Sequence, residues 1–352
     1  IQLDAKITNT MSYQERYAPQ FDTLNNQAVF RGFASQNAYR TGTYSISFVT
    51  IQTFFEDNLG KKRESPAFSQ FENNRQIIAE RLNDKNPNTS RGFRYDTSAQ
   101  DALIPAFLAA YSRTSPQKIA LTAFPQIPLP NWRIDYAGLP NILPAIKKVF
   151  PSISITHSYS NTYAVSSYNS SLQYGGDTVS INRFFSPYYP SLGDSGGVFV
   201  PINVINQVSI VERFAPLIGF NFKTKSNMNF RIEYRTDRTL NFNLSNRQVT
   251  ETRNEDFTVG YGYTKANMKL PVKWQGRDVV LKNDVTFRVD VSRRESTAVQ
   301  RRLDGPAVIT QGQVNFNIRP NISYQVNQRL TTQIYFEYTF VRPKVSTSFT
   351  RT

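Results

Sequence analysis

The chain of 352 residues lacks several features on which common classes of protein depend. It contains no cysteine, which excludes disulfide scaffolds, thiol catalysis and thiolate metal sites. Its single histidine, His157, has no convergent set of carboxylates around it in the sequence. The longest apolar run, 102–111, is ten residues long, whereas a membrane-spanning helix needs about 20. We therefore expect no helical membrane domain and no catalytic, cofactor or metal site.

The charge of the chain is strongly positive without being concentrated in the sequence. Lysine and arginine number 41 against 26 acidic residues, which gives a net charge of +15. The basic residues are scattered, and no basic helix or RNA-binding signature accompanies them. We therefore expect water-facing positions for them and no nucleic-acid partner.

Strict alternation of apolar and polar residues is the dominant pattern, in segments of about ten residues. Between 227 and 235, and again from Leu240, apolar side chains occupy every second position, and the intervening 236–238 predicts a tight hairpin. A period of two places apolar side chains on one face of a sheet, so the sequence predicts antiparallel strands. Other clear runs have their apolar positions at Phe257, Val259, Tyr261 and Tyr263, at Val285, Phe287, Val289 and Val291, at Val314, Phe316 and Ile318, and at Ile334, Phe336, Tyr338 and Phe340.

The range 64–148 has a different pattern, which predicts a helical and extended insertion. Ser65 and Pro66 form a helix-start signal, and a second helix is expected from Asp101. A proline-rich connector then leads to Trp132, whose large ring is expected to anchor the insertion. The expected domains are strands over 1–63, an insertion over 64–148 that shapes or caps a pore, and strands over 149–352. The apolar stripes of the two helices are Phe68, Phe71, Ile78 and Leu82, and Leu103, Phe107, Leu108 and Tyr111.

A region rich in glycine and proline, at about 175–204, predicts a long surface loop. Within it, 193–197 (GDSGG) copies the nucleophile loop of chymotrypsin-like proteases. A catalytic triad also needs a histidine base and an aspartate partner, and His157 lies 38 residues upstream in an alternating segment. We expect a glycine-rich turn here and no protease activity.

Alternating strands fit either a soluble sandwich or a membrane barrel. Strands of about ten residues, aromatic residues near segment ends and an alternate face rich in Asn, Gln, Ser, Thr and Arg favour the barrel. We therefore predict an all-β, antiparallel fold of the transmembrane outer-membrane β-barrel type, with a small helical insertion. The predicted lumen-facing residues are Arg231, Glu233, Arg235, Asn241, Asn243, Asn315, Asn317 and Arg319. The residues predicted to face lipid or packed protein are Phe230, Ile232, Leu240, Phe242, Val314, Phe316 and Phe336.

Several stretches resemble the SprA (Sov) family, the outer-membrane translocons of the type IX secretion and gliding-motility system. They are scattered between about residue 70 and the end of the chain, and their order and unusual composition make the resemblance specific. The stretches are 104–111 (IPAFLAAY), 127–136 (IPLPNWRIDY), 167–174 (SYNSSLQY), 212–219 (ERFAPLIG), 230–235 (FRIEYR) and 342–349 (RPKVSTSF).

The resemblance implies a very large single-chain barrel that exports folded proteins across the outer membrane of a Bacteroidetes-type Gram-negative bacterium. The implied partners are a PorV-type outer-membrane barrel, a periplasmic plug protein, cargo with a type IX C-terminal signal, and outer-membrane lipid or lipopolysaccharide. At about 20 residues per strand with its connection, 352 residues supply roughly 15 to 18 strands. We therefore expect the C-terminal part of a longer polypeptide, which does not close a barrel by itself.

Two functions remain open from the sequence. The first is a protein-conducting translocon without catalysis, in which the insertion shapes one pore end through Phe68, Phe71, Phe107, Leu108 and Trp132 and docks partner proteins. The second is a substrate-selective porin or barrel enzyme of about 16 strands, in which 64–148 folds into the lumen as a constriction.

Overall fold

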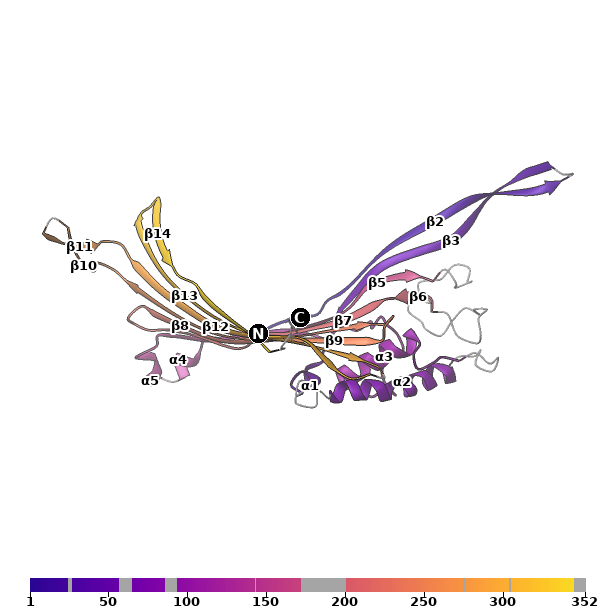
Figure 1. Cartoon of the computed structure of the whole chain (residues 1–352), viewed down its shortest axis with the longest axis horizontal. Coiled ribbons are helices and arrows are strands. Elements are labelled where there is room, and N and C mark those ends of the chain that lie inside the picture. The colour runs from indigo at the N-terminus through magenta and orange to yellow at the C-terminus, as the bar shows by residue number, and fades with distance from the viewer. Residues whose placement is uncertain are drawn as a thin grey trace, which may run out of the picture.

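The computed structural model describes residues 1–24, 27–56, 65–85, 94–142, 144–171, 201–274, 276–303 and 305–344. Long antiparallel strands make up most of this part of the chain, which confirms the predicted all-β class (Figure 1). The strands are β1 Gln2–Asp4, β2 Ile7–Leu24, β3 Gln27–Ser47, β4 Asn131–Tyr136, β5 Ser152–Ser170, β6 Asn203–Ile205, β7 Gln207–Lys223, β8 Met228–Asn243, β9 Gln248–Lys265, β10 Met268–Trp274, β11 Arg277–Leu281, β12 Val285–Arg302, β13 Val308–Asn327, β14 Leu330–Tyr335 and β15 Tyr338–Pro343. The helices are α1 Ile51–Phe54, α2 Pro66–Lys85, α3 Gln100–Ser112, α4 Leu139–Ile142 and α5 Pro144–Lys147.

One antiparallel sheet of 13 strands organises the molecule. Its main path runs β1-β4-β5-β7-β8-β9-β12-β13-β14. β3 pairs with β5 and carries β2 on its other edge, β6 pairs with β5, and β15 pairs with β13. Within the described residues, no strand pairing joins the β2 side of this sheet to the β14 and β15 side, so the sheet is open.

The central strands are much longer than the ten residues predicted, because adjacent alternating segments belong to one strand. β8 covers 16 residues and runs through 236–238, so the predicted hairpin at Thr236–Arg238 is wrong. The apolar positions before and after this stretch are all even-numbered, and a straight strand therefore keeps them on one face. The chain turns instead at 244–247, where Arg247 adopts a positive φ of 51° and β9 follows.

The predicted helices form close to their expected positions. The side chain of Ser65 accepts a hydrogen bond from the backbone N–H of Phe68 at 3.2 Å, which satisfies a free donor at the start of α2. α3 begins at Gln100 and includes Pro105. Both helices lie along one side of the sheet, below the strands in Figure 1, while α4 and α5 lie at the other end of the strands.

The core lies between α2, α3 and one end of the sheet. The ring of Phe71 packs against Phe107 and Phe242, with centroid separations of 5.9 and 5.2 Å. Phe107 also lies 5.3 Å from Phe242. Tyr44, Ile46, Tyr163, Val165, Val208, Ile210, Leu240 and Val249 complete the sheet side of this buried cluster.

The insertion also contributes to the sheet itself. β4 falls within 64–148 and pairs with both β1 and β5, so this range supplies a strand as well as helices. Most of the loop predicted at 175–204, including the 193–197 sequence, lies outside the described residues. No helix among the described residues is long and apolar enough to cross a membrane.

We predict that Phe71→Ala or Phe107→Ala will destabilise the packing of the helices on the sheet by about 3–5 kcal/mol, because each truncation leaves a cavity in a fully buried cluster. Asn73→Ala changes an exposed residue of α2 and serves as the control, with an expected effect below about 0.5 kcal/mol. Denaturant unfolding in detergent, followed by proteolysis of α2, compares the stability of the core variants with that of the control. Equal resistance of all three variants would contradict the core assignment.

Candidate functional site

The strand register determines which side chains share a face of the sheet. β8 pairs with β9, and β9 with β12, over their full lengths without a register shift. Every even-numbered residue of β8 therefore lies on one face, here called the apolar face, with Phe230 and Phe242 as examples. The opposite face, here called the polar face, carries Arg231 and Asn241.

The apolar face is divided along the strands into three zones. The first zone lies beneath α2 and α3 and contains Phe242 and Leu240, both fully buried. The second zone is a charged belt across the middle of the sheet. The third zone extends to the other end of the strands, where Ile232 and Phe257 remain exposed. Members of the charged belt on the central strands are Glu212, Arg238, Glu251, Arg253, Glu255, Arg293, Glu295 and Arg301.

Arg238 and Glu212 form the most deeply buried ion pair of the belt. Arg238 Nη2 lies 2.7 Å from Glu212 Oε2, and both side chains are 0% exposed. The guanidinium also donates to the carbonyl oxygen of Thr53 at 2.7 Å and to its hydroxyl at 2.9 Å. It lies 5.3 Å from the centre of the Phe54 ring. These contacts connect α1 to the sheet.

A second buried pair lies beside the first. Arg301 Nη1 contacts Glu251 Oε2 at 2.8 Å, and Arg253 Nη2 donates to the carbonyl oxygen of Phe54 at 2.6 Å. Arg301 is only 2% exposed and is therefore buried within the protein. Its charge is neutralised within the protein and contributes little to the field on the polar face.

A cluster of aromatic side chains connects β4 to the charged belt. The indole of Trp132 stacks on the ring of Tyr159 with centroids 4.3 Å apart. The hydroxyl of Tyr159 donates to Glu212 Oε1 at 2.6 Å, and burial together with that carboxylate raises the pKa of Tyr159. The His157 ring accepts a hydrogen bond from Trp132 Nε1 at Nε2 (3.1 Å), and its Nδ1 lies 2.6 Å from the Leu217 carbonyl oxygen, so the imidazole connects β4 to β7.

The exposed zone of the apolar face, here called the apolar band, is open to the surroundings. Phe257, Val259 and Tyr261 on β9 are 36–45% exposed. On this strand, Glu255 and Lys265 bound the band and lie ten positions apart. A tilted strand needs about 9–11 residues to cross a membrane, so the spacing of these charges matches such a crossing. The band continues through Phe220, Phe222, Phe230, Ile232, Phe287, Val289, Val291, Phe316, Ile318, Ile322, Tyr338 and Phe340.

All eight residues predicted to face a lumen lie on the polar face. Arg231 and Arg235 both pair with Glu233, and the distance from Arg235 Nε to Glu233 Oε1 is 2.6 Å. Arg319 pairs with Glu337 at 2.8 Å, and Asn317 donates to the same carboxylate at 3.0 Å. The remaining three predicted residues, also on this face, are Asn241, Asn243 and Asn315. Whether water in a pore contacts them stays a prediction.

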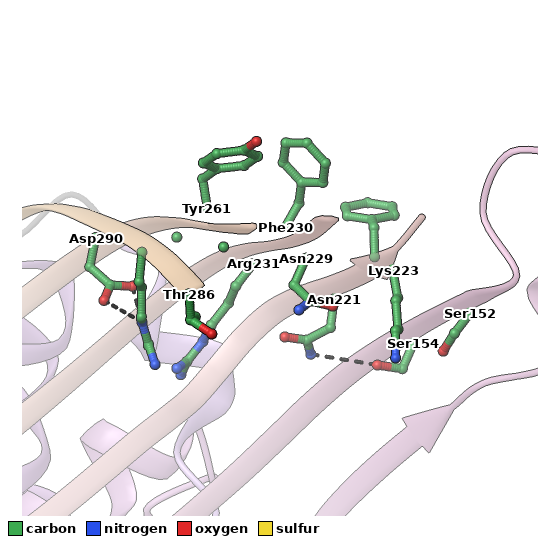
Figure 2. Close-up of a pocket in the computed structure, with 14 residues that line it drawn as sticks. Ser152, Ser154, Asn221, Lys223, Asn229, Phe230, Arg231, Tyr261, Thr286 and Asp290 are labelled. Atoms are coloured by element: carbon green, nitrogen blue, oxygen red, sulfur yellow. Dashed lines mark hydrogen bonds and ion pairs between the residues drawn. The ribbon is translucent and has the colours of Figure 1, made fainter. Parts of the chain in front are cut away.

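A shallow groove crosses the polar face near the end of β7, β8, β9 and β12 (Figure 2). Its volume is about 410 Å³. Gly260 lies between Arg231 and Asp290 in the register, and a Cβ there would come within 2.7 Å of Asp290 Oδ1. Within the groove, Arg288 pairs with Asp290 at 2.7 Å, while Lys223 is in none of the ion pairs of the described residues.

Four of the five predicted insertion contacts are buried, and the fifth, Trp132, is partly buried against Tyr159. Phe68 is 7% exposed, and Phe71, Phe107 and Leu108 are 0–1% exposed. They pack within the helices and against the sheet, so a partner protein cannot reach them while the helices remain in place. Docking of a partner on the insertion therefore has to use its outer surface.

The functional residues that sequence reasoning missed are the buried charges of the belt. Arg238 occupies an even position of β8, where the pattern calls for an apolar residue, and Glu251 is similarly placed on β9. This break in the alternation is the sequence feature from which the buried charges could have been predicted. Among the described residues, no group of three or more histidines and carboxylates could hold a metal ion.

Comparison with known proteins gives no family assignment, because no family model matches the chain and no curated protein matches it.

We predict that Arg238→Met will destabilise the protein by about 3–5 kcal/mol, because it leaves the carboxylate of Glu212 buried without its partner. Adding Glu212→Leu should restore much of that loss, since an apolar pair of similar volume carries no desolvation cost. Arg235→Met, on the polar face with a half-exposed side chain, should cost about 1 kcal/mol or less. Denaturant unfolding monitored by tryptophan fluorescence compares the variants. A double variant as unstable as Arg238→Met would contradict this account.

Proposed function

We propose that this chain forms part of the wall of a protein-conducting barrel in the outer membrane of a Gram-negative bacterium. The apolar band would face lipid, and the polar face would line a wide aqueous pore. The observation that carries the proposal is the apolar band itself, whose bounding charges Glu255 and Lys265 are separated by about one tilted membrane crossing. The resemblance to the type IX secretion translocons supports the choice of folded proteins as cargo.

The positions of α2 and α3 support a conduit over a porin with an internal constriction. Both helices cover the apolar face, the side opposite to Arg231 and Asn241. In a barrel with a polar lumen, they would form a collar outside the wall at one end of the strands. The proposed role of the insertion is therefore to cover the apolar wall beyond the membrane and to offer an outer surface to partners. A cap across the pore would need the helices on the other face.

The partners remain part of the same proposal. A second outer-membrane barrel of the PorV type would contact the wall or the collar, a plug protein would act from the periplasmic side, and secreted cargo would pass along the polar face. No catalytic step is needed, because passage of a folded protein requires only a wet and wide interior.

The membrane position of the apolar band is tested by placing arginine at its centre. We predict that Val259→Arg will reduce membrane assembly, because a lipid-facing arginine near the bilayer midplane costs about 2–4 kcal/mol. Thr258→Arg, one position along β9 on the polar face, introduces the same side chain into water and should assemble normally. Membrane fractionation and resistance of the folded protein to detergent compare the two variants. Normal assembly of both would indicate that the band is not in lipid.

Passage of cargo is tested by photo-crosslinking in cells that secrete through this protein. A photoreactive amino acid at Ser292, on the polar face of β12, should capture secreted proteins while transport is under way. The same group at Val291, on the adjacent apolar position, should capture none. Equal capture of cargo at both positions, or at neither, would contradict transport along the polar face.

A further inference from the structure

One end of the sheet carries an exposed cluster of basic residues, here called the basic rim. It lies at the end farthest from α2 and α3, where α4, α5, β10 and β11 are found at the left of Figure 1. Seven of its eight members are lysines. The basic rim consists of Lys147, Lys148, Lys223, Lys225, Lys265, Lys269, Lys282 and Arg329, all exposed.

The basic side chains of the rim are not paired with carboxylates in the described part of the chain. Acidic neighbours among the described side chains include Asp284, two positions after Lys282, and Asp290, which lines the same groove as Lys223 and pairs with Arg288. The ion pairs found in the described part of the chain include none of the eight basic residues. The arginines of the polar face differ, since Arg231 and Arg288 each have a carboxylate partner. Within the described part of the chain, the basic rim is therefore a group of eight exposed basic side chains that take part in no ion pair.

The basic rim adjoins the apolar band directly. Lys265 ends β9 on the apolar face, two residues beyond Tyr263. Lys223 ends β7 on the polar face, opposite Asn229, one position beyond Phe222 of the band. Lys225 and Lys282 lie in the connections that follow β7 and precede β12. A lysine at the edge of an apolar surface extends its methylene chain along that surface and presents its ammonium group to the polar side.

We propose that the basic rim binds the phosphate headgroups of an anionic lipid surface. This inference rests on the proposed function, in which the apolar band lies in lipid. The charges follow the ends of several neighbouring strands instead of converging in a pocket, which suits a planar layer of phosphates better than a single small anion. Each basic residue held close to an anionic membrane surface attracts it, and the attraction is screened by salt.

The test uses the protein purified from its membrane in a non-ionic detergent, with fluorescent phosphatidylglycerol in mixed micelles as the probe and phosphatidylcholine as the uncharged comparison. The rim variant carries Lys225→Gln, Lys265→Gln and Lys282→Gln. The control variant loses the same three charges elsewhere, through Lys6→Gln, Lys118→Gln and Arg302→Gln, which are exposed residues away from the rim.

We expect the rim variant to bind phosphatidylglycerol at least about tenfold more weakly than the unchanged protein, and the control variant to bind within about twofold of it. Roughly 0.5 M salt should abolish the preference for phosphatidylglycerol over phosphatidylcholine. Equal binding by the rim variant would overturn the proposal. So would competition by inorganic phosphate or polyglutamate at matched charge, which would indicate a small-anion site or an acidic polypeptide. Because binding is measured without secretion, its outcome is independent of the cargo-crosslinking result.

Discussion

The constraint on which the structure depends is that an apolar sheet face has to be covered at every level of its strands. The central strands are 16–20 residues long, and their register keeps the same face apolar over that whole length. At one end the chain covers this face itself, by packing Phe71 and Phe107 onto Phe242. At the other end the described part of the chain provides no cover, and the face remains open. A lipid layer would cover this exposed half of the apolar face.

The charged belt lies between the half of the apolar face that the helices cover and the half that remains exposed. Arg238 and Glu212 are fully desolvated, and their mutual contact together with the Thr53 carbonyl offsets the cost of burying them. This belt stabilises the position of α1 on the sheet, because sliding of the helix would remove the Thr53 and Phe54 carbonyl oxygens from the guanidinium groups of Arg238 and Arg253.

Charge is distributed differently on the two faces and at the ends of the sheet. On the polar face, Arg231, Arg288 and Arg319 are each held beside a carboxylate. Among the described residues, the eight basic side chains of the basic rim are exposed and take part in none of the ion pairs.

The sequence by itself determined the antiparallel sheet, the two helices and the face on which each strand residue lies, because a period of two and a helix-start signal at Ser65 are local properties. It did not determine that 236–238 continues β8, since alternation of the same parity fits either a turn or a straight strand. Nor did it determine that Arg238 and Glu212, 26 residues apart, would meet beneath α1. Only the tertiary structure decided which half of the apolar face the helices cover. The position of the helices depends on the alignment of neighbouring long strands and on which buried charges are paired with one another.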